Sequence, residues 1–359
     1  MFEATTVSII ESYRPAWVLA DGPESDVVIS TRARLARNLV GKPFPSKATR
    51  EDLESVVSEV ITALEAVEDD FSSFIKVHLS DLGTLERLFL VDAHVASYDQ
   101  LETGTQSVLL LDPGGQIAIM INEEDHIRLQ SISSGLRSAE VWEMVDCLDV
   151  RLSGGVEYAF SKVLGYLTAS PGNLGTGLRV SVMLHLGGLA LMENADSIAR
   201  ASQILGMSVR GLYGEGTAAL GDFYQVSNET SLGMPETEII QRVIGVAAHY
   251  ARKERDSREY LLRSERRAIV GLLRDSFDGI RRADGLSAET SLKCISTLRV
   301  GLAIGLVEGI TMGDLNDLLV QLRAGDPALW YASRYVEQQT NGGRAVMFRR
   351  TLRNAAVVE

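Results

Sequence analysis

The sequence predicts an α/β domain up to about residue 240 and a helical domain after it, so the expected domains are 1–240 and 241–359. Between about residues 26 and 232, short runs with the apolar or alternating pattern of strands are interspersed with amphipathic runs typical of helices. Glycine-rich segments such as PGNLGTG and RGLYGEG separate these runs. From Pro235 onward the pattern is helical almost throughout, with strongly charged faces.

Each expected element follows from its local pattern. The expected strands are Val27–Leu35, Phe74–Leu79, Val108–Leu111, Gln116–Ile121, His126–Ile132, Leu164–Thr168, Arg179–Leu186, Ser208–Tyr213 and Phe223–Ser227. Apolar residues recur with helical spacing in three further segments of this part of the chain. These expected helices are Glu51–Val67, Ser134–Val150 and Ala195–Leu205.

The composition is that of a globular protein: 359 residues, 45% of them hydrophobic and 23% charged, with a formal net charge of −13. This acidic balance argues against a protein that coats nucleic acid. No apolar run approaches the roughly 18 residues that a membrane span needs, and the first residues lack the pattern of a secretory signal. Cys147 and Cys294 form no CxxC or CxxH pattern, which favours a reducing, cytoplasmic compartment.

Arg32 and Arg34 occupy alternate positions of the first expected strand, Val27–Leu35. One face of this strand would carry Val28, Ser30, Arg32 and Arg34, and the other would carry Val27, Ile29, Thr31, Ala33 and Leu35. Two arginines side by side repel each other unless an anion or carboxylates lie over them. A solvated outer face with salt bridges is the plainer alternative.

The segment NEEDHIRLQ, residues 122–130, has a similar pattern. If the strand begins near Glu124, one face would carry Glu124, His126, Arg128 and Gln130. The apolar residues Ile127 and Leu129 would then point into the core. An acidic turn with a capping role is the alternative.

Two glycine-rich segments carry the remaining candidates. SPGNLGTG leads into a strand on which Arg179, Ser181, Met183 and His185 share a face, and its backbone amides could cradle an anion. It does not match the GxxxxGK[ST] pattern of a P-loop. RGLYGEG carries Arg210 and Glu215, and its glycines indicate mobility or close approach to a ligand. Together, five arginines at strand and loop edges of an acidic protein suggest a site for a polyanion such as a nucleoside triphosphate.

Four segments in this order and spacing resemble the phosphagen (guanidino) kinases, and most closely the bacterial McsB-type protein-arginine kinases. They are STRAR, NEEDHIR, NLGTGLR, and RGLYGE followed by YQVSN, within about residues 26–240. The resemblance implies an α+β fold, with an antiparallel sheet of about eight strands flanked by helices, as in guanidino kinases and glutamine synthetase. A helical C-terminal domain follows it.

The resemblance also implies roles for individual residues, with ATP and Mg²⁺ as cofactors. Glu124 and Glu215 match the two carboxylates that hold the substrate guanidinium, the arginines match those that clamp the ATP phosphates, and His94 matches a histidine near the adenine. The implied nucleotide-binding residues are Ser30, Thr31, Arg32, Ala33, Arg34, His94, Arg128, Arg179, Val180, Ser181, Val182, Met183, Arg210, Gly211, Leu212, Tyr213, Gly214 and Glu215. No dedicated protein ligands for the metal are expected, because nucleotide and water would hold it.

The sequence departs from the family pattern at three places. Small-molecule phosphagen kinases carry a long helical domain before the STRAR strand, whereas 29 residues precede Ser30 here, which favours an open site for arginine on a protein. Ser170 stands where the family commonly has a reactive cysteine, so thiol-based regulation is not expected at this position. The RDxxRA motif that binds phosphoarginine in relatives is reduced to TNGGRA, Thr340–Ala345, so weak or absent phosphoarginine feedback is expected.

The expected function is ATP-dependent phosphorylation of arginine on proteins, which marks them for Clp-type proteolysis. A kinase for a free guanidino compound, and a catalytically weak adaptor for phosphoarginine or protease components, remain as alternatives. The expected partners are proteins with exposed arginine, an activator protein, Clp protease components and a second copy of the chain. No nucleic acid or membrane is expected as a partner.

Overall fold

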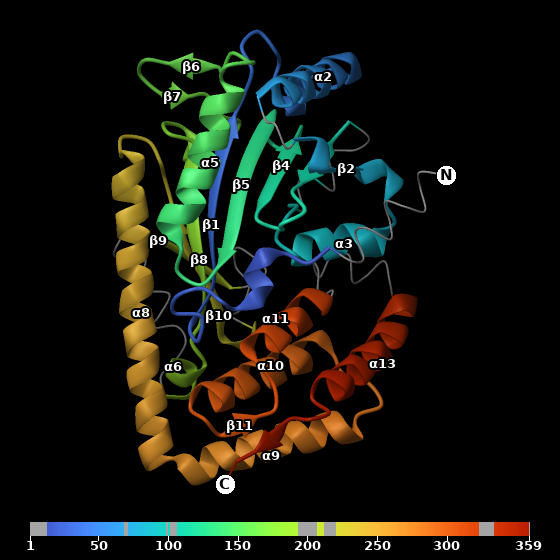
Figure 1. The fold of residues 1–359 in the computed structure, drawn as a ribbon, viewed down its shortest axis with the longest axis vertical. Coiled ribbons are helices and arrows are strands. Elements are labelled where there is room, and N and C mark those ends of the chain that lie inside the picture. Colours follow the sequence, from blue (N-terminus) through green and yellow to red (C-terminus); the bar gives the residue numbers. More distant parts are fainter. Residues whose placement is uncertain are drawn as a thin grey trace.

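The structure is a computed structural model that describes residues 13–67, 71–97, 100, 106–192, 207–211, 220–322 and 334–358. An eight-stranded sheet lies at its centre, in the order β2-β3-β4-β5-β1-β8-β10-β9 (Figure 1). All neighbouring strands of this sheet are antiparallel, as the resemblance implied. The strands are β1 (Val28–Arg37), β2 (Ile75–His78), β3 (Val108–Leu111), β4 (Ile117–Ile121), β5 (Ile127–Ser134), β8 (Leu178–His185), β9 (Met207–Gly211) and β10 (Phe223–Asn228).

Helices cover both faces of the sheet. Those of eight residues or more are α2 (Arg50–Val67), α3 (Thr84–Asp92), α5 (Ser138–Leu152), α8 (Glu236–Ser264), α9 (Arg266–Arg282), α10 (Ala288–Ala303), α11 (Met312–Gln321) and α13 (Arg334–Thr351). Shorter elements are α6 (Gly187–Met192), the 3-10 turns η1 (Ala16–Leu19), η2 (Pro45–Lys47), η3 (Phe71–Ser73), η4 (Leu79–Asp81), η5 (Pro171–Asn173) and η6 (Leu220–Asp222), and the pairs β6 (Phe160–Ser161) with β7 (Gly165–Tyr166) and β11 (Val307–Glu308) with β12 (Ala356–Val357).

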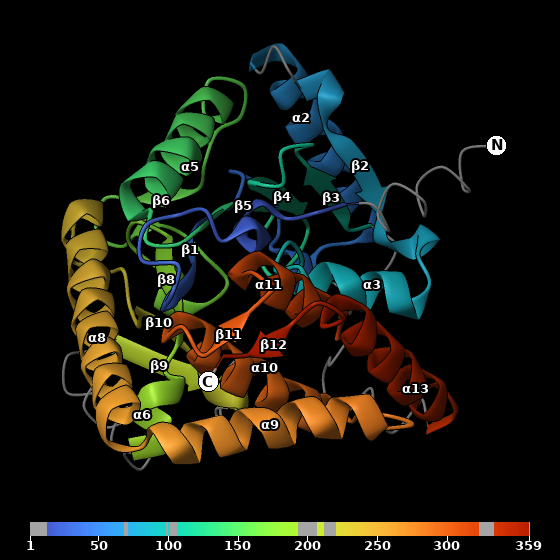
Figure 2. The ribbon, with the colours of Figure 1, turned by 60° about the horizontal axis from the view of Figure 1, so that its bottom comes forward.

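Two apolar cores lie on opposite faces of the sheet. One core joins the sheet to α2, α5 and α8, and the other joins it to η1, α3 and the C-terminal helices. In Figure 2 the strands lie between α2, α5 and α8 on one side and α3, α10 and α11 on the other. The alternation of β8 decides which side chain enters which core: Val180, Val182 and Leu184 pack in the first core, and Met183 packs in the second.

The alternation expected for β1 holds only for its second half. Its register against β8 shifts between Val28 and Ser30, which is the mark of a β-bulge. Val27 and Val28 therefore pack in the same core as Ala33 and Leu35, whereas Ile29 turns to the opposite face. The sequence predicted that Val28 shares a strand face with the arginines and that Ile29 lies on the other face. Both placements are wrong, because the bulge inserts one residue.

Other expected elements are confirmed with shifted bounds. The helix expected at Ser134 begins at Ser138, because β5 continues to Ser134. The strand expected at Leu164–Thr168 is only the short β7, paired with β6 outside the main sheet. The helix expected at Ala195–Leu205 lies outside the described residues.

The expected domain boundary at residue 240 falls inside α8. This helix runs without a break from Glu236 to Ser264. Its apolar side chains as far as Ala251 pack in the same core as the sheet, whereas Leu261 belongs to the core of the C-terminal helices. The change from one core to the other therefore comes after residue 251.

Candidate active site

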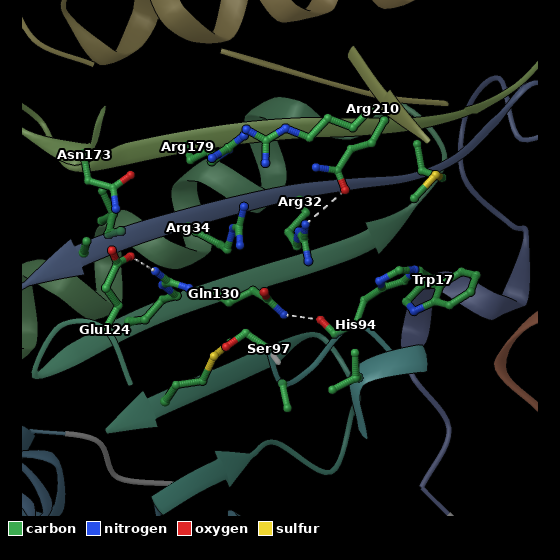
Figure 3. Close-up of a pocket in the computed structure, with 18 of the residues that line it drawn as sticks. Trp17, Arg32, Arg34, His94, Ser97, Glu124, Gln130, Asn173, Arg179 and Arg210 are labelled. Atoms are coloured by element: carbon green, nitrogen blue, oxygen red, sulfur yellow. Dashed lines mark hydrogen bonds and ion pairs between the residues drawn. The ribbon is translucent and has the colours of Figure 1, made fainter. Parts of the chain in front are cut away.

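A cavity of about 500 Å³ lies on the face of the sheet opposite α2, α5 and α8 (Figure 3). Its floor comes from six neighbouring strands, β4, β5, β1, β8, β10 and β9. Its walls come from the end of α3 with the segment after it and from the glycine-rich segment around η5. Trp17 from η1 and Leu319 from α11 also line it. Segments from the whole length of the chain thus meet around one hollow.

Five arginines line this cavity, and all five are those predicted from the sequence. Arg32 and Arg34 come from β1, Arg128 from β5, Arg179 from β8 and Arg210 from β9. Strand pairing brings them together, because Arg34 lies directly opposite Arg179 across the β1–β8 ladder. Figure 3 shows the guanidinium groups of Arg32, Arg34, Arg179 and Arg210 gathered over neighbouring strands.

Like charges repel one another within the arginine cluster. Burial, with the nearby charges of Arg179 and Arg128, lowers the pKa of Arg32 to about 10. The same causes hold the pKa of Arg34 well below its usual value, with Arg32 as the largest charged neighbour. The Nε of Arg34 is buried and makes no hydrogen bond within the described part of the chain. Like charges held together in a medium of low dielectric are relieved by an anion, so the cavity favours a ligand with several negative charges.

Two adjacent glutamates hold Arg128 at one end of the cluster. The Arg128 guanidinium donates to Glu123 Oε1 at 2.5 Å and to Glu124 Oε2 at 3.2 Å. Glu123 is wholly buried and also accepts a hydrogen bond from the Ser97 hydroxyl, whereas 38% of the Glu124 side chain is exposed and lines the cavity. The contact between Glu123 and Arg128 was not predicted from the sequence. In the sequence, this contact is indicated by the position of Glu123 five residues before Arg128.

The strand expected to begin near Glu124 begins at Ile127 instead. Residues 122–126 form a turn in which Asn122 has a positive φ of 57°. His126 therefore leaves the polar face: its Nδ1 accepts from Leu39 N at 3.0 Å, and its Nε2 lies 2.9 Å from Pro43 O. The expected placement of His126 beside Glu124 is wrong, and its role is to hold the turn.

The glycine-rich segment is held against the cavity by several side chains. Asp125 Oδ1 accepts from Ala169 N at 2.7 Å, and Arg37 donates to Thr176 O at 2.9 Å. Gly177 has a φ of +70°, and a Cβ there would lie 2.7 Å from Ala36 O, so this close approach requires glycine. Ser170 and Asn173 line the cavity as a result.

The opposite end of the cavity is aromatic. Trp17 and His94 have ring centroids 5.3 Å apart, and Trp17 Nε1 donates to Ala93 O at 3.0 Å. His94 has a φ of 60°, and its carbonyl accepts from Gln130 Nε2 at 2.6 Å. Burial, with the charges of Arg32 and Arg34, lowers the pKa of His94 to about 3, so its imidazole is neutral. No motif indicated Trp17 or Leu319, because each reaches the site from a segment remote from the four motifs.

Several predicted binding residues support the site from beneath. Thr31 donates to Gly135 O at 2.7 Å, and the side chains of Ala33, Val180 and Val182 are wholly buried in the core with α2, α5 and α8. Their side chains therefore cannot reach a ligand in the cavity, because β1 and β8 alternate their faces. Ser30 is buried and does not line the cavity, and Ser181 accepts from Arg32 Nε at 3.4 Å.

Met183 and Gly211 line the cavity as expected. Leu212, Tyr213, Gly214 and Glu215 lie outside the described residues. The placement of the second predicted carboxylate, Glu215, therefore stays a prediction.

Comparisons with known proteins agree with this geometry. Residues 55–257 match the C-terminal catalytic domain of the ATP:guanido phosphotransferases. A protein-arginine kinase from Pelotomaculum thermopropionicum is 38% identical over 343 residues, which cover 95% of this chain and 96% of the relative. A protein-arginine kinase from Brevibacillus brevis is 36% identical over 339 residues, which cover 94% of this chain and 95% of the relative.

Solved structures of guanidino kinases share the fold. A lombricine kinase has a TM-score of 0.56 and 28% identity, and the match covers 66% of this chain and 68% of that one. A duplicated taurocyamine kinase from Schistosoma mansoni has a TM-score of 0.58 and 26% identity. That match covers 66% of this chain but only 34% of the duplicated one. The arginine-lined cavity, the matched catalytic domain and the full-length relatives lead to one conclusion: the chain belongs to the ATP:guanido phosphotransferase family.

Proposed function

We propose that the protein transfers the γ-phosphoryl group of ATP to the guanidinium of arginine residues on other proteins. One observation carries this proposal: five arginines and a partly exposed glutamate, Glu124, line the same cavity. The arginines suit a triphosphate, and the carboxylate suits a guanidinium. The relatives named protein-arginine kinase, similar over almost their whole length, support a protein substrate.

The arginine cluster would act on the phosphates. Phosphoryl transfer depends mainly on positioning and on neutralising the charge that develops on the transferred group. Arg32, Arg34 and Arg179 are held on paired strands of the sheet before any ligand enters, so they need little reorganisation. At the other end, Trp17 and the neutral His94 offer flat surfaces for a nucleobase.

Magnesium would enter with the nucleotide. Among the residues that the structure describes, no three His, Cys, Asp or Glu side chains form a group that could hold a metal ion. Glu123 is already bonded to Arg128 and Ser97, which leaves Glu124 as the carboxylate of this pair that faces the cavity. When bound with the nucleotide, Mg²⁺ would reduce the negative charge of the phosphates.

Glu124 would prepare the nucleophile. An arginine side chain has a pKa of about 12.5–13.8, so deprotonating it at neutral pH costs about 7–9 kcal/mol. A carboxylate orients the planar guanidinium by paired hydrogen bonds and accepts its proton as the N–P bond forms, which contributes about 10²–10⁴ in rate. Arg128 fixes the Glu124 carboxylate at 3.2 Å for this task. We propose Glu215 as the second carboxylate.

We further propose a cytoplasmic enzyme that acts as a homodimer, marks proteins for a Clp-type protease and has an activator protein as a partner. Among the described residues, no helix is both long enough and apolar enough to cross a bilayer. These proposals rest on the similarity to bacterial protein-arginine kinases, and they concern partners that lie beyond the catalytic step.

The experiment is incubation with Mg-ATP and an unfolded protein, followed by mass spectrometry of acid-labile phosphate on arginine. Wild type is expected to label the protein, and Glu124→Gln is expected to lose about 10²–10⁴ of this activity. Glu140→Gln, an exposed glutamate on α5, is the matched control and should retain it. No label with wild type would contradict the proposal, and equal activity on free arginine would favour a small-molecule kinase.

A further inference from the structure

We propose that the tip of the β6–β7 hairpin is a docking surface for apolar side chains that flank the target arginine in a non-native polypeptide. The proposal rests on the proposed function, because only a polymeric substrate extends beyond the cavity. Val163 is 85% exposed, Phe160 58% and Leu164 40%. Val163 is the most exposed large hydrophobic residue of the described chain.

The hairpin is held rigidly at its base. The Arg37 guanidinium lies over the Tyr166 ring at 3.6 Å and forms a buried ion pair with Asp149 at 2.7 Å. Ala159 N donates to Asn38 O at 2.7 Å, which ties the first strand of the hairpin to the end of β1. This rigid base holds the apolar tip of the hairpin at a fixed place in solvent, so the tip cannot collapse onto the protein.

The same hairpin is joined to the wall of the active site. Tyr166 N donates to Gly175 O at 2.8 Å, and Gly175 belongs to the glycine-rich segment that presents Ser170 and Asn173 to the cavity. Asn173 and Glu124 lie at the same end of the cavity in Figure 3, which is the end proposed for the guanidinium. A chain whose arginine enters there therefore leaves the cavity beside the hairpin.

A fourth exposed apolar residue extends this surface. A Cβ on Gly175 would lie 2.7 Å from the Cα of Leu232, so the backbones of these two residues are in close contact. Leu232 is 46% exposed. Leu164 adjoins Gly165 in the sequence, and Leu232 adjoins the backbone of Gly175, which forms a β-bridge with Gly165. We call Phe160, Val163, Leu164 and Leu232 the apolar rim.

The chemistry of this rim selects its occupant. A free guanidino compound fits inside the cavity and gains nothing from apolar residues outside it. A non-native polypeptide exposes apolar side chains near its arginines, and burying them against the rim stabilises the complex. Figure 1 shows the hairpin at the end of the molecule opposite α9 and the other C-terminal helices, so those helices leave it uncovered.

The test compares two short peptides with one central arginine, flanked either by leucines or by serines. Wild type is expected to have the lower KM for the leucine-flanked peptide. The double variant Val163→Ser/Leu164→Ser is expected to raise that KM by about tenfold, with kcat and the serine-flanked KM unchanged. Val163→Leu should preserve the preference, and Val346→Ser, which alters a 60% exposed valine on α13, is the matched control.

Each other outcome overturns the proposal in a recognisable way. Equal KM values of wild type for both peptides, or a preference that survives the double variant, would show that the rim does not bind substrate. An equal loss on both peptides would show that the tip positions the glycine-rich segment instead. A change in sedimentation of the double variant with unchanged kinetics would assign the tip to contact between copies of the chain. Phosphorylation of free arginine but of neither peptide would refute the proposed function itself.

Discussion

Buried arginines occur in two regions of this molecule with opposite surroundings. Around the cavity, Arg32 and Arg34 lie among other arginines, and burial together with these neighbours lowers their pKa. On the α5 side of the sheet, Arg37 is buried and forms an ion pair with Asp149 at 2.7 Å. Arg34 and Arg37 are only three residues apart on the same strand.

The difference separates a binding role from a structural one. The ion pair of Arg37 is complete within the chain, with further hydrogen bonds to Ala36 O and Thr176 O. The guanidinium of Arg34 has Arg32, Arg128 and Arg179 as charged neighbours, and Glu123 alone acts in the favourable direction. A cation held mainly among like charges destabilises the folded protein, and a bound anion reverses that effect. The surroundings of a buried arginine, more than its burial, therefore indicate function.

The largest expected effect is on catalysis. Arg34→Ala is expected to lower kcat by about 10³–10⁵, because it removes one of the charges that stabilise the transferring phosphoryl group. Its fold should be as stable as that of wild type or more so, because the variant relieves repulsion with Arg32. Single-turnover phosphorylation and urea unfolding measure the two effects. Full activity of Arg34→Ala would show that the cavity arginines do not differ from Arg37 in their role in catalysis.

The opposite pattern is expected at Arg37. Arg37→Ala leaves Asp149 buried without its partner, which is expected to cost about 3–5 kcal/mol of unfolding free energy. The double variant Arg37→Met/Asp149→Leu should recover much of this stability, because it removes both charges. Urea unfolding is the measurement. An Arg37→Ala protein as stable as wild type would mean that the ion pair contributes nothing to the fold.

A smaller effect is expected from an anion alone. Inorganic triphosphate at about 100 times its dissociation constant should stabilise wild type by about 2.7 kcal/mol, because it binds only the folded cluster. The same addition should stabilise Arg34→Ala less, since a phosphate contact is lost. Thermal melts with and without triphosphate check this. Sodium chloride at equal ionic strength is the control, and an equal shift with that salt would exclude specific binding.

Local patterns were sufficient to predict most of the sheet and the arginine cluster. In β8 the alternation of Arg179 and Met183 with buried valines is unambiguous, so the strand and its polar face follow directly. The antiparallel pairing did not follow from these patterns and came from the resemblance. The alternation of strands and helices alone was equally compatible with a parallel sheet.

What the sequence could not reveal depends on tertiary contacts. The bulge at Val28–Ser30 changes which face Ile29 occupies, although the local alternation there is regular. His126 leaves the site because its ring nitrogens find backbone partners at Leu39 and Pro43, far away in the sequence. Trp17 and Leu319 line the cavity only because η1 and α11 pack against each other. None of these contacts has a local signature.

The last expected effect concerns pH and extends the comparison to buried histidines. Burial holds the pKa of His185 well below its usual value, and it lowers the pKa of His94 to about 3. Both remain neutral in the folded protein, whereas in the unfolded chain they gain protons below a pH of about 6.5. Their contribution to stability is therefore complete above about pH 6.5 and is lost as the pH falls toward the folded values. Each is expected to remove up to about 1.4 kcal/mol of unfolding free energy per pH unit in that range.

Burial of Asp125 and Asp222 acts in the opposite direction, because it raises the pKa of each carboxyl and favours protonation of the folded state. These carboxyl groups offset the histidines only as the pH approaches their own range. Urea unfolding from neutral to mildly acidic pH measures the balance, and His185→Asn should reduce the slope. Bound triphosphate should favour protonation of His94, because the neutral ring lies beside Arg32 and Arg34. It should therefore weaken the acid sensitivity of the unfolding free energy of wild type, which gives a second measurement. An acid sensitivity that triphosphate leaves unchanged would place the anion away from His94 and the arginine cluster beside it.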